Sequence, residues 1–244
     1  MKTLEDIKRD GWESGINQVW NVDCSEAMKL IPDKSIDMIL TDPPYKIQFV
    51  GKGSLAKKFD YRKNDINGIG SNINFDLIPF LNIMKPKLKK MNMYVWMAKQ
   101  SIPEVIDWIR KNNFFWDLLI WGKNNPLPAY NFKYLSDIEY CFFIKESGMH
   151  WTKGLRYEMY KKVMIDNLQS IKGHPTPKPL WMMKKSIMVS SKQNDIILDP
   201  FFGSGTTGMA CKILNRRFIG MEIIPKYCQL AETRLKNTIQ EMFI

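Results

Sequence analysis

The sequence is poor in the side chains that bind metals or cross-link a chain. It has two histidines and four cysteines, and no Cys-x-x-Cys pair occurs among Cys24, Cys141, Cys211 and Cys228. Structural zinc sites need such closely spaced ligands, so we expect no metal site. Three of the cysteines lie in apolar surroundings, which is typical of reduced thiols in a protein core.

Long apolar runs are also missing. No stretch approaches the roughly 20 apolar residues of a membrane span. The N-terminal Met1-Lys2-Thr3-Leu4-Glu5-Asp6 lacks the apolar core of a secretory signal peptide. No internal repeat or low-complexity tract is visible. We therefore expect an intracellular, cytoplasmic protein with no membrane partner.

The composition provides enough apolar residues for one substantial core. Of the 244 residues, 45% are hydrophobic, which favours a globular chain, and we expect a single domain over 1–244. The formal net charge of +11 favours a polyanionic partner. Many basic proteins do not bind nucleic acid, so the charge alone leaves the partner open.

Patterns typical of buried strands alternate with helical patterns along the chain. We expect a strand that ends near Asp23, and further strands at 36–41, 92–97, 115–121, 138–145, 194–199 and 218–221. Helices are expected at 25–31, 76–85, 102–112 and 209–214, and between Tyr227 and Ile239. This alternation predicts an α/β fold with a doubly wound, mostly parallel sheet.

The most informative segment is Asp42-Pro43-Pro44-Tyr45, which follows the expected strand 36–41. Open α/β sheets bind their ligands at this end of a strand. Asp42 and the Pro43 carbonyl can accept the hydrogens of an amino group, and Tyr45 offers a face for base stacking. Pro44 stiffens the turn. The segment predicts a site for a flat, amino-bearing base, although a rigid Pro-Pro loop with a surface tyrosine also fits it.

A second constellation consists of a strand, a glycine-rich turn and a helix. The strand that begins at 194 ends at Asp199. The glycine-rich segment Pro200-Phe201-Phe202-Gly203-Ser204-Gly205-Thr206-Thr207-Gly208 follows it, and Glu222 ends the next strand. Glycines let a ligand approach the backbone, and the helix start offers free N–H groups. An acid at the second strand end can accept hydrogen bonds from ribose hydroxyls. This unit predicts a site for a nucleoside-containing cofactor.

The same glycines satisfy the dinucleotide pattern G-x-G-x-x-G. Residues 223–244 leave room for one helix only, so a second nucleotide-binding half cannot follow. A nicotinamide or flavin enzyme is therefore a lesser alternative, as is a purely structural turn.

Together, the two motifs resemble the DNA amino-methyltransferases that use S-adenosylmethionine and act on adenine N6 or cytosine N4. Because 42–45 precedes the glycine-rich turn, the order resembles the beta class. That class implies a circularly permuted, seven-stranded, Rossmann-like sheet with a small target-recognition insertion. The match extends to Asn21-Val22-Asp23-Cys24 and His174-Pro175-Thr176-Pro177-Lys178-Pro179.

The resemblance also implies residue roles, with Asp42, Pro43, Pro44 and Tyr45 as the catalytic segment. The cofactor S-adenosyl-L-methionine would contact Asp23, Thr176, Lys178, Asp199, Phe201, Gly203, Ser204, Gly205, Thr206 and Glu222. Glu222 would hold the ribose hydroxyls, and Asp23 would lie near the adenine. Thr176 and Lys178 would lie near the amino-acid end. Two plain alternatives stay open, because Asp23 also fits a helix cap and Lys178 a solvated helix start.

Two segments are candidates for contact with the target. Residues 46–74 and 146–173 both mix cationic with aromatic side chains. The cations suit contact with phosphates, and the aromatic rings suit contact with bases. By position, 146–173 resembles the family's target-recognition region, and an ordinary surface segment is the alternative.

The resemblance implies direct methyl transfer to a flipped base in double-stranded DNA. No cysteine follows a proline, so the Pro-Cys nucleophile of ring-carbon cytosine methyltransferases is absent. Within the resembled family, Asp in the first position of the motif usually goes with adenine, so the resemblance favours adenine N6 over cytosine N4, although either amino group fits physically. An RNA or protein-amide methyltransferase and a non-catalytic DNA-binding protein are the rival interpretations. A cognate restriction endonuclease and a homodimer stay open as partners, and the resembled enzymes imply a prokaryotic or phage-infected cell.

Overall fold

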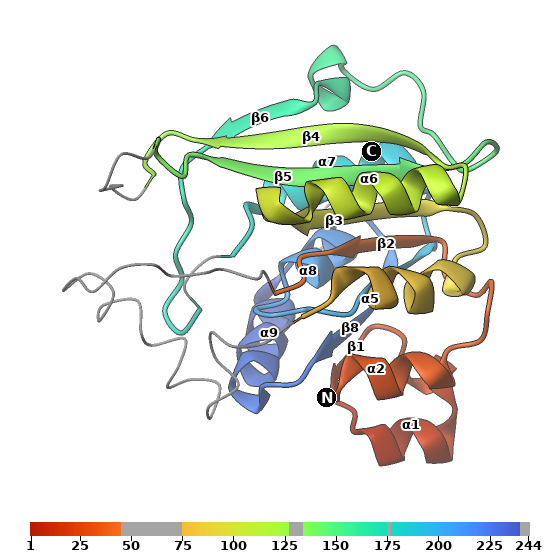
Figure 1. The fold of residues 1–244 in the computed structure, drawn as a ribbon. Helices are drawn as coiled ribbons and strands as arrows, with labels where there is room; N and C mark the ends of the chain where they lie inside the picture. Colours follow the sequence, from red (N-terminus) through yellow and green to blue (C-terminus); the bar gives the residue numbers. More distant parts are fainter. Residues whose placement is uncertain (45–74, 127–133, 175–176, 240–244) are drawn as a thin grey trace.

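A central sheet determines where every candidate residue lies. The structure, a computed structural model, describes residues 1–44, 75–126, 134–174 and 177–239. Within them, eight strands form one sheet in the order β1-β8-β7-β2-β3-β5-β4-β6 (Figure 1). The strands are β1 (Gln18–Asn21), β2 (Met38–Thr41), β3 (Asn92–Met97), β4 (Phe115–Lys123), β5 (Ile138–Lys145), β6 (Val163–Asp166), β7 (Ile196–Asp199) and β8 (Arg217–Glu222).

The sheet is mostly parallel, as the alternating pattern predicts. Strands β1, β8, β7, β2 and β3 run parallel to one another, and among the described strands only β5 runs antiparallel, between β3 and β4. The expected count of seven strands is corrected to eight among the described residues. The additional strand is β6, which pairs in parallel with β4 at the sheet edge. It is short and exposed on one face, so it has no continuous apolar run to mark it in the sequence.

Helices cover both faces of the sheet (Figure 1). One face carries α1 (Leu4–Asp10), α2 (Cys24–Ala27), α5 (Leu77–Met84) and α6 (Ile102–Lys111). The other carries α7 (Leu180–Ser190), α8 (Thr206–Ile213) and α9 (Pro225–Asn237). Short 3₁₀ turns occupy Trp12–Gly15, Met28–Leu30, Lys85–Lys87, Lys99–Ser101 and Tyr157–Tyr160. This arrangement confirms the doubly wound α/β class.

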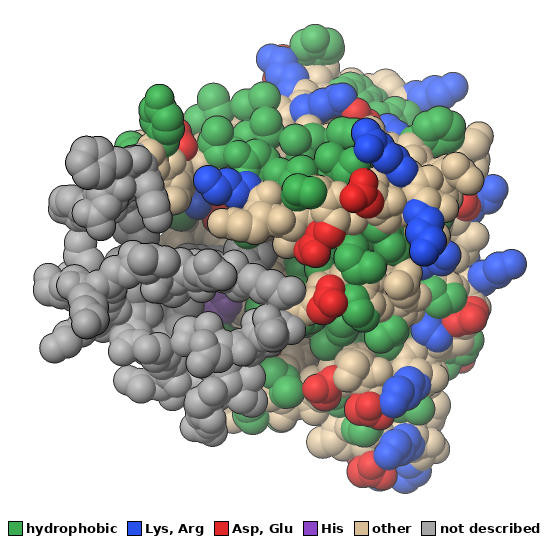
Figure 2. Space-filling model, in the orientation of Figure 1, with side chains coloured by type: hydrophobic (Ala, Val, Ile, Leu, Met, Phe, Trp, Pro, Cys, Tyr) green, Lys and Arg blue, Asp and Glu red, His purple; other side chains and the backbone are tan. Residues whose placement is uncertain are grey.

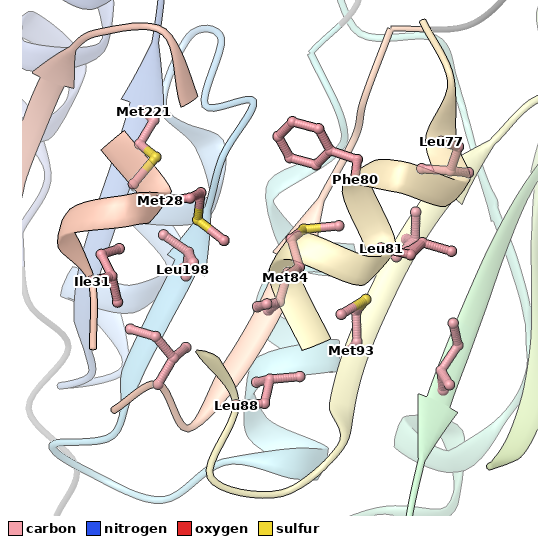
Figure 3. Close-up of a cluster of buried hydrophobic side chains, with 14 of the residues drawn as sticks. Met28, Ile31, Leu77, Phe80, Leu81, Met84, Leu88, Met93, Leu198 and Met221 are labelled. Atoms are coloured by element: carbon pink, nitrogen blue, oxygen red, sulfur yellow. The ribbon is translucent and has the colours of Figure 1, made fainter. Parts of the chain in front are cut away.

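The central strands are buried on both faces, which explains their continuous apolar runs. All six residues of β3 and all four of β2 are buried. Figure 3 shows how Met84 and Leu81 of α5 lie beside Met93 of β3, while Met28 and Leu198 lie nearer to Met221 of β8. Burying each such side chain contributes about 1.5–3 kcal/mol. The core therefore fixes the strand ends at which the candidate motifs begin.

The outer strands leave part of one sheet face uncovered. Trp116 of β4, Ile138 of β5, and Val163 and Ile165 of β6 are exposed large apolar side chains. The strand register places all four on the same face, since Trp116 lies opposite Ile144 and Gly122 lies opposite both Ile138 and Ile165. Figure 2 shows hydrophobic side chains gathered over this part of the molecule.

The expected state of the cysteines agrees with the structure. Cys141, Cys211 and Cys228 are buried free thiols, and Cys24 is half-buried. Across the four described ranges, no group of three or more potential metal ligands occurs. In the same ranges, every helix is too short or too polar to cross a bilayer.

Candidate active site

The two sequence motifs meet because their strands are neighbours. Strands β2 and β7 pair in parallel, with Met38 opposite Ile197 and Ile39 opposite Leu198. Their carboxyl ends therefore reach the same edge of the sheet, where a cavity of about 630 Å³ opens. Among its described walls are most of the predicted residues, namely Asp23, Asp42, Pro44, Lys178, Asp199, Phe201, Gly203, Ser204, Thr206 and Glu222.

Asp199 joins the end of β7 to the end of β2. Thr41, the residue before Asp42, donates from Oγ1 to Asp199 Oδ1 at 2.9 Å, and Phe201 N–H donates to the same oxygen at 3.1 Å. Thr207 Oγ1 donates to the other oxygen at 2.7 Å. Burial raises the pKa of Asp199 to about 7 despite these donors. The buried Asp199 side chain thus links the end of β2 with the glycine-rich turn, and Asp199 also lines the cavity.

The glycine-rich turn bends through two residues with positive φ. Gly203 has φ of 52° and Gly205 has φ of 81°, a region that favours glycine. A Cβ at Gly205 would lie 2.9 Å from Ala231 Cβ of α9, and Gly205 is absent from the described cavity wall. The Cβ position of Gly205 thus faces α9 in close packing, and the role of Gly205 as a cofactor contact stays a prediction. Gly203 and Ser204, in contrast, line the cavity.

Arg234 of α9 donates hydrogen bonds to the glycine-rich turn. Its Nη1 donates to Ser204 O at 2.6 Å, to Ser204 Oγ at 2.7 Å and to Thr206 Oγ1 at 3.3 Å. Burial lowers the pKa of Arg234. Sequence reasoning missed this residue, because nothing local marks one cation among several on α9 as the partner of a distant loop.

Glu222 presents a half-buried carboxylate at the end of β8. Its Oε2 accepts from Gly203 N–H at 2.9 Å and its Oε1 accepts from Ile224 N–H at 2.8 Å. Burial raises the pKa of Glu222, although both N–H groups and that of Ile223 oppose this. The carboxylate is therefore held by the backbone against the cavity, with its acceptor oxygens fixed in direction.

Asp23 lies at the start of α2, two residues after Asn21, which pairs with Glu222 in the sheet. It accepts from Ser25 N–H at 2.7 Å and caps the helix, so the plain alternative for this residue is correct. It also lines the cavity, so capping does not remove it from the site.

An aromatic cluster forms the apolar wall. The ring of Phe201 lies 5.2 Å from that of Phe75 and 5.0 Å from that of Phe80, centroid to centroid. Phe75 and Phe80 also line the cavity, and the motifs gave no signal for either. They reach the site because α5 packs beside the turn.

Lys178 lies at the centre of a buried charge cluster. Its Nζ pairs with Asp42 Oδ2, lies 3.1 Å from Glu139 Oε2 and sits 5.2 Å from the centre of the Trp96 ring. Burial works to lower the pKa of Lys178, but the carboxylates of Asp42 and Glu139 outweigh it and raise that pKa. The interpretation of Lys178 as a solvated helix start is therefore wrong, since its side chain is only 8% exposed.

The candidate site is thus a cavity at the carboxyl ends of the strands of an α/β sheet. The Pro-Pro turn that carries a carboxylate and the glycine-rich turn both belong to it. A comparison with known families adds that the family described as DNA methylase matches residues 36–233. The chain belongs to the DNA methylase family. Its Asp42 and its glycine-rich turn both fall inside the matched range.

Known members of the family resemble this methylase along most of their length. The type II methyltransferase M.HinfI of Haemophilus influenzae is 32% identical, over 91% of this chain and 69% of that protein. M2.MboI of Moraxella bovis is 30% identical, over 88% and 86% respectively. Among solved structures, the M1.HpyAVI–SAM complex is 30% identical with a TM-score of 0.67, covering 89% of this chain and 99% of that one. The cytosine-N4-specific PvuII DNA methyltransferase shares the fold, with a TM-score of 0.69 at 18% identity.

Some predicted site residues lie elsewhere in this methylase or outside the described part. Pro43 is buried, next to the exposed Pro44 at the cavity. Tyr45, Thr176 and the segment 46–74 fall outside the described residues. His174 of the second flanking motif lines the cavity, and its ring meets that of Tyr227 edge-on at 4.9 Å.

Proposed function

We propose that this methylase transfers the methyl group of S-adenosyl-L-methionine to the N6 amino group of adenine in double-stranded DNA. The observation that supports this most is the shared cavity, which has Asp42 and Pro44 on one side and the glycine-rich turn with Glu222 on the other. A methyl donor and an amino acceptor need such a common space. Membership of the DNA methylase family and its type II relatives support DNA as the substrate.

The cavity fits the methyl donor in chemistry as well as in size. Glu222 offers fixed carboxylate oxygens for ribose hydroxyls, and the Phe201 wall suits a flat adenine ring. A relative that is 30% identical has been solved with SAM bound. When bound, the donor supplies an electrophilic methyl group on a sulfonium. Asp23, Ser204 and Thr206 would complete its cradle, and Thr176 is proposed to approach its amino-acid end.

The chain's own residues account for activation of the base. The amino nitrogen of adenine is a weak nucleophile, because its lone pair is conjugated with the ring. Asp42 and the Pro43 carbonyl accept its two hydrogens and draw the lone pair out of conjugation. Tyr45 stacks on the flipped base. As the nitrogen forms its bond to the methyl carbon, the bond between that carbon and the sulfonium sulfur would break, and the excess proton on the nitrogen would pass to Asp42 or to water.

We infer adenine rather than cytosine from the acid at position 42, with cytosine N4 as the alternative. The motif order, with 42–45 before the glycine-rich turn, supports the permuted beta class. The segments 46–74 and 146–173 are proposed to contact the duplex. In the second, the ring of Trp151 stacks near that of Tyr160, at 5.8 Å between centroids, and Lys161 lies over Tyr157.

Partners beyond DNA are also part of this proposal. The exposed apolar face of β4, β5 and β6 supports a homodimer, which sedimentation at several protein concentrations tests. The type II relatives support a cognate restriction endonuclease, and hence a prokaryotic setting. Digestion of methylated and unmethylated DNA in the source cell's extract tests that partner.

The deciding experiment is methyl transfer from labelled donor to duplex DNA, RNA and protein extract, followed by digestion of the DNA to nucleosides. N6-methyladenine is the expected product, and N4-methylcytosine would support the alternative. Asp42→Ala should abolish transfer and leave donor affinity within about twofold. Substantial remaining activity in that variant would rule out the role given to Asp42.

A further inference from the structure

Glu139 is a partly buried acid that belongs to neither motif. It lies near the start of β5, with its side chain 18% exposed, and it is not among the described residues that line the cavity. Its Oε1 lies 2.7 Å from Lys123 Nζ of β4, and its Oε2 lies 3.1 Å from Lys178 Nζ. Burial works to raise the pKa of Glu139, but Lys178 and Lys123 outweigh it and hold that pKa below its usual value.

These contacts create a row of alternating charges that ends at the candidate catalytic acid. Lys123, Glu139, Lys178 and Asp42 follow one another across β4, β5, the segment before α7 and the end of β2. Buried ion pairs are weak sources of stability, because removing charges from water costs several kcal/mol per ion. The row therefore calls for an explanation in the chemistry of the site.

We propose that Glu139 is a positioning residue for methyl transfer, which anchors the Lys178 ammonium beside Asp42 so that the Asp42 carboxylate can turn to the target amino group. This inference rests on the proposed function of Asp42. Glu139 itself touches neither base nor donor, and it acts through Lys178.

The physical reason is the number of partners available to one ammonium. With Asp42 as its sole carboxylate partner, Lys178 would follow that carboxylate and occupy its acceptor oxygens. Glu139 is fixed on a strand between β3 and β4, and Lys123 holds its other oxygen. Lys178 therefore keeps one carboxylate partner and the Trp96 ring when Asp42 accepts hydrogens from a base.

The same pair of strands provides a matched control. Asp117 of β4 pairs with Lys145 of β5 at 2.5 Å and with Lys162, away from the cavity. It is a partly buried acid between two lysines, like Glu139, but it has no contact with Lys178. If Glu139 only tied β4 to β5, its loss and the loss of Asp117 would have similar effects on catalysis.

The test compares Glu139→Gln, which keeps the size of the side chain, with Asp117→Asn. We expect Glu139→Gln to reduce kcat at least tenfold, with the Kd for S-adenosylmethionine within twofold of wild type. Asp117→Asn should keep kcat within twofold, and Glu139→Asp should recover part of the lost kcat. An unchanged kcat in Glu139→Gln overturns the inference, and so does a loss of kcat that Asp117→Asn matches.

A second readout does not depend on methyl transfer. The ¹³Cε signal of Lys178, assigned by its absence in Lys178→Arg, reports the titration of the ammonium. Removal of the Glu139 carboxylate should move this titration at least one pH unit lower in Glu139→Gln and leave it in place in Asp117→Asn. An unmoved titration overturns the anchoring contact. If the wild-type protein transfers no methyl group, the proposed function fails by itself, and this titration still decides whether Glu139 holds Lys178.

Discussion

Thr41 and Asp199 are 158 positions apart in the sequence, and the hydroxyl of Thr41 donates a 2.9 Å hydrogen bond to the Asp199 carboxylate. Both side chains are buried, at 2% and 4% exposure. Asp42 follows Thr41 directly, and the glycine-rich turn follows Asp199. One hydrogen bond between side chains thus connects the residue before Asp42 with the residue at which the glycine-rich turn begins.

We predict that Thr41→Val uncouples the two segments. Valine keeps the volume of threonine but leaves Asp199 Oδ1 with one donor fewer, which costs about 1–3 kcal/mol of folding free energy. Asp42 loses part of its support, so kcat should fall several-fold more than donor affinity does. Urea unfolding and steady-state methylation measure the two effects.

Thr207→Val is the matched control, because Thr207 donates to the other oxygen of Asp199 without touching β2. It should lose similar stability and a smaller part of kcat. Equal losses of kcat in the two variants would show that the bond to Thr41 has no special part in holding Asp42.

The pKa of Asp199 predicts how stability changes with pH. Its value of about 7 in the folded protein exceeds the ordinary 3.8, so between these values the folded state binds more protons than the unfolded state. The free energy of unfolding therefore falls as pH rises through this window, by at most about 1.4 kcal/mol per unit. Asp199 contributes its full stabilisation below about pH 4 and loses it as pH passes 7.

Asp199→Asn removes this titration and keeps an oxygen that can accept from Thr41. The difference in unfolding free energy between wild type and variant should shrink or reverse as pH rises from 4 to 8. Glu222 and Asp195 also have raised pKa values, but both remain in the variant, so the difference isolates Asp199. Parallel stability curves for the two proteins would contradict the prediction.

Much of this fold follows from sequence patterns, because the buried strands carry continuous apolar runs. The expected strands 92–97 and 138–145 coincide with β3 and β5, and the expected helix 102–112 ends one residue beyond α6. Helix α1 and strand β6 were not expected. Helix α1 has one buried residue, Ile7, and β6 buries only Met164, so neither has the periodic apolar pattern that identifies an element.

In the candidate site, too, some residues are predictable from the sequence and others are not. Asp42, Asp199 and Glu222 are predictable, because each follows or ends a parallel strand and such ends share one edge. Glu139 and Arg234 lie within elements that sequence patterns do identify, but their partners depend on strand order and on how α9 packs. No local sequence pattern encodes the strand order. The motifs can therefore be predicted from the sequence, whereas the residues that support them cannot.

Gly205 gives a prediction about packing between the glycine-rich turn and α9. Gly205→Ala should be destabilised for two reasons, the left-handed backbone at about 1–2 kcal/mol and a Cβ placed 2.9 Å from Ala231 Cβ. Ala231→Gly removes the second cause and costs about 1 kcal/mol of helix propensity itself. In a double-mutant cycle by urea unfolding, the double variant should be more stable than the two single losses predict, by at least about 0.5 kcal/mol. Strict additivity would mean that α9 does not limit the space above Gly205.

The last prediction concerns the Glu222 carboxylate, whose oxygens the backbone holds at the cavity. Glu222→Gln keeps the shape of the side chain but removes the charge and replaces one acceptor oxygen with a donor. The Gly203 or Ile224 N–H then faces an NH₂ group, and a ribose hydroxyl loses a charge-assisted partner worth about 1.5–3 kcal/mol. We expect the Kd for S-adenosylmethionine to rise about 10- to 100-fold in calorimetric titrations, while Glu26→Gln, which alters an exposed ion pair with Lys29 on the same side of the sheet, leaves it unchanged. An unaltered Kd in Glu222→Gln would move the ribose away from β8 and require a different orientation of the donor in the cavity.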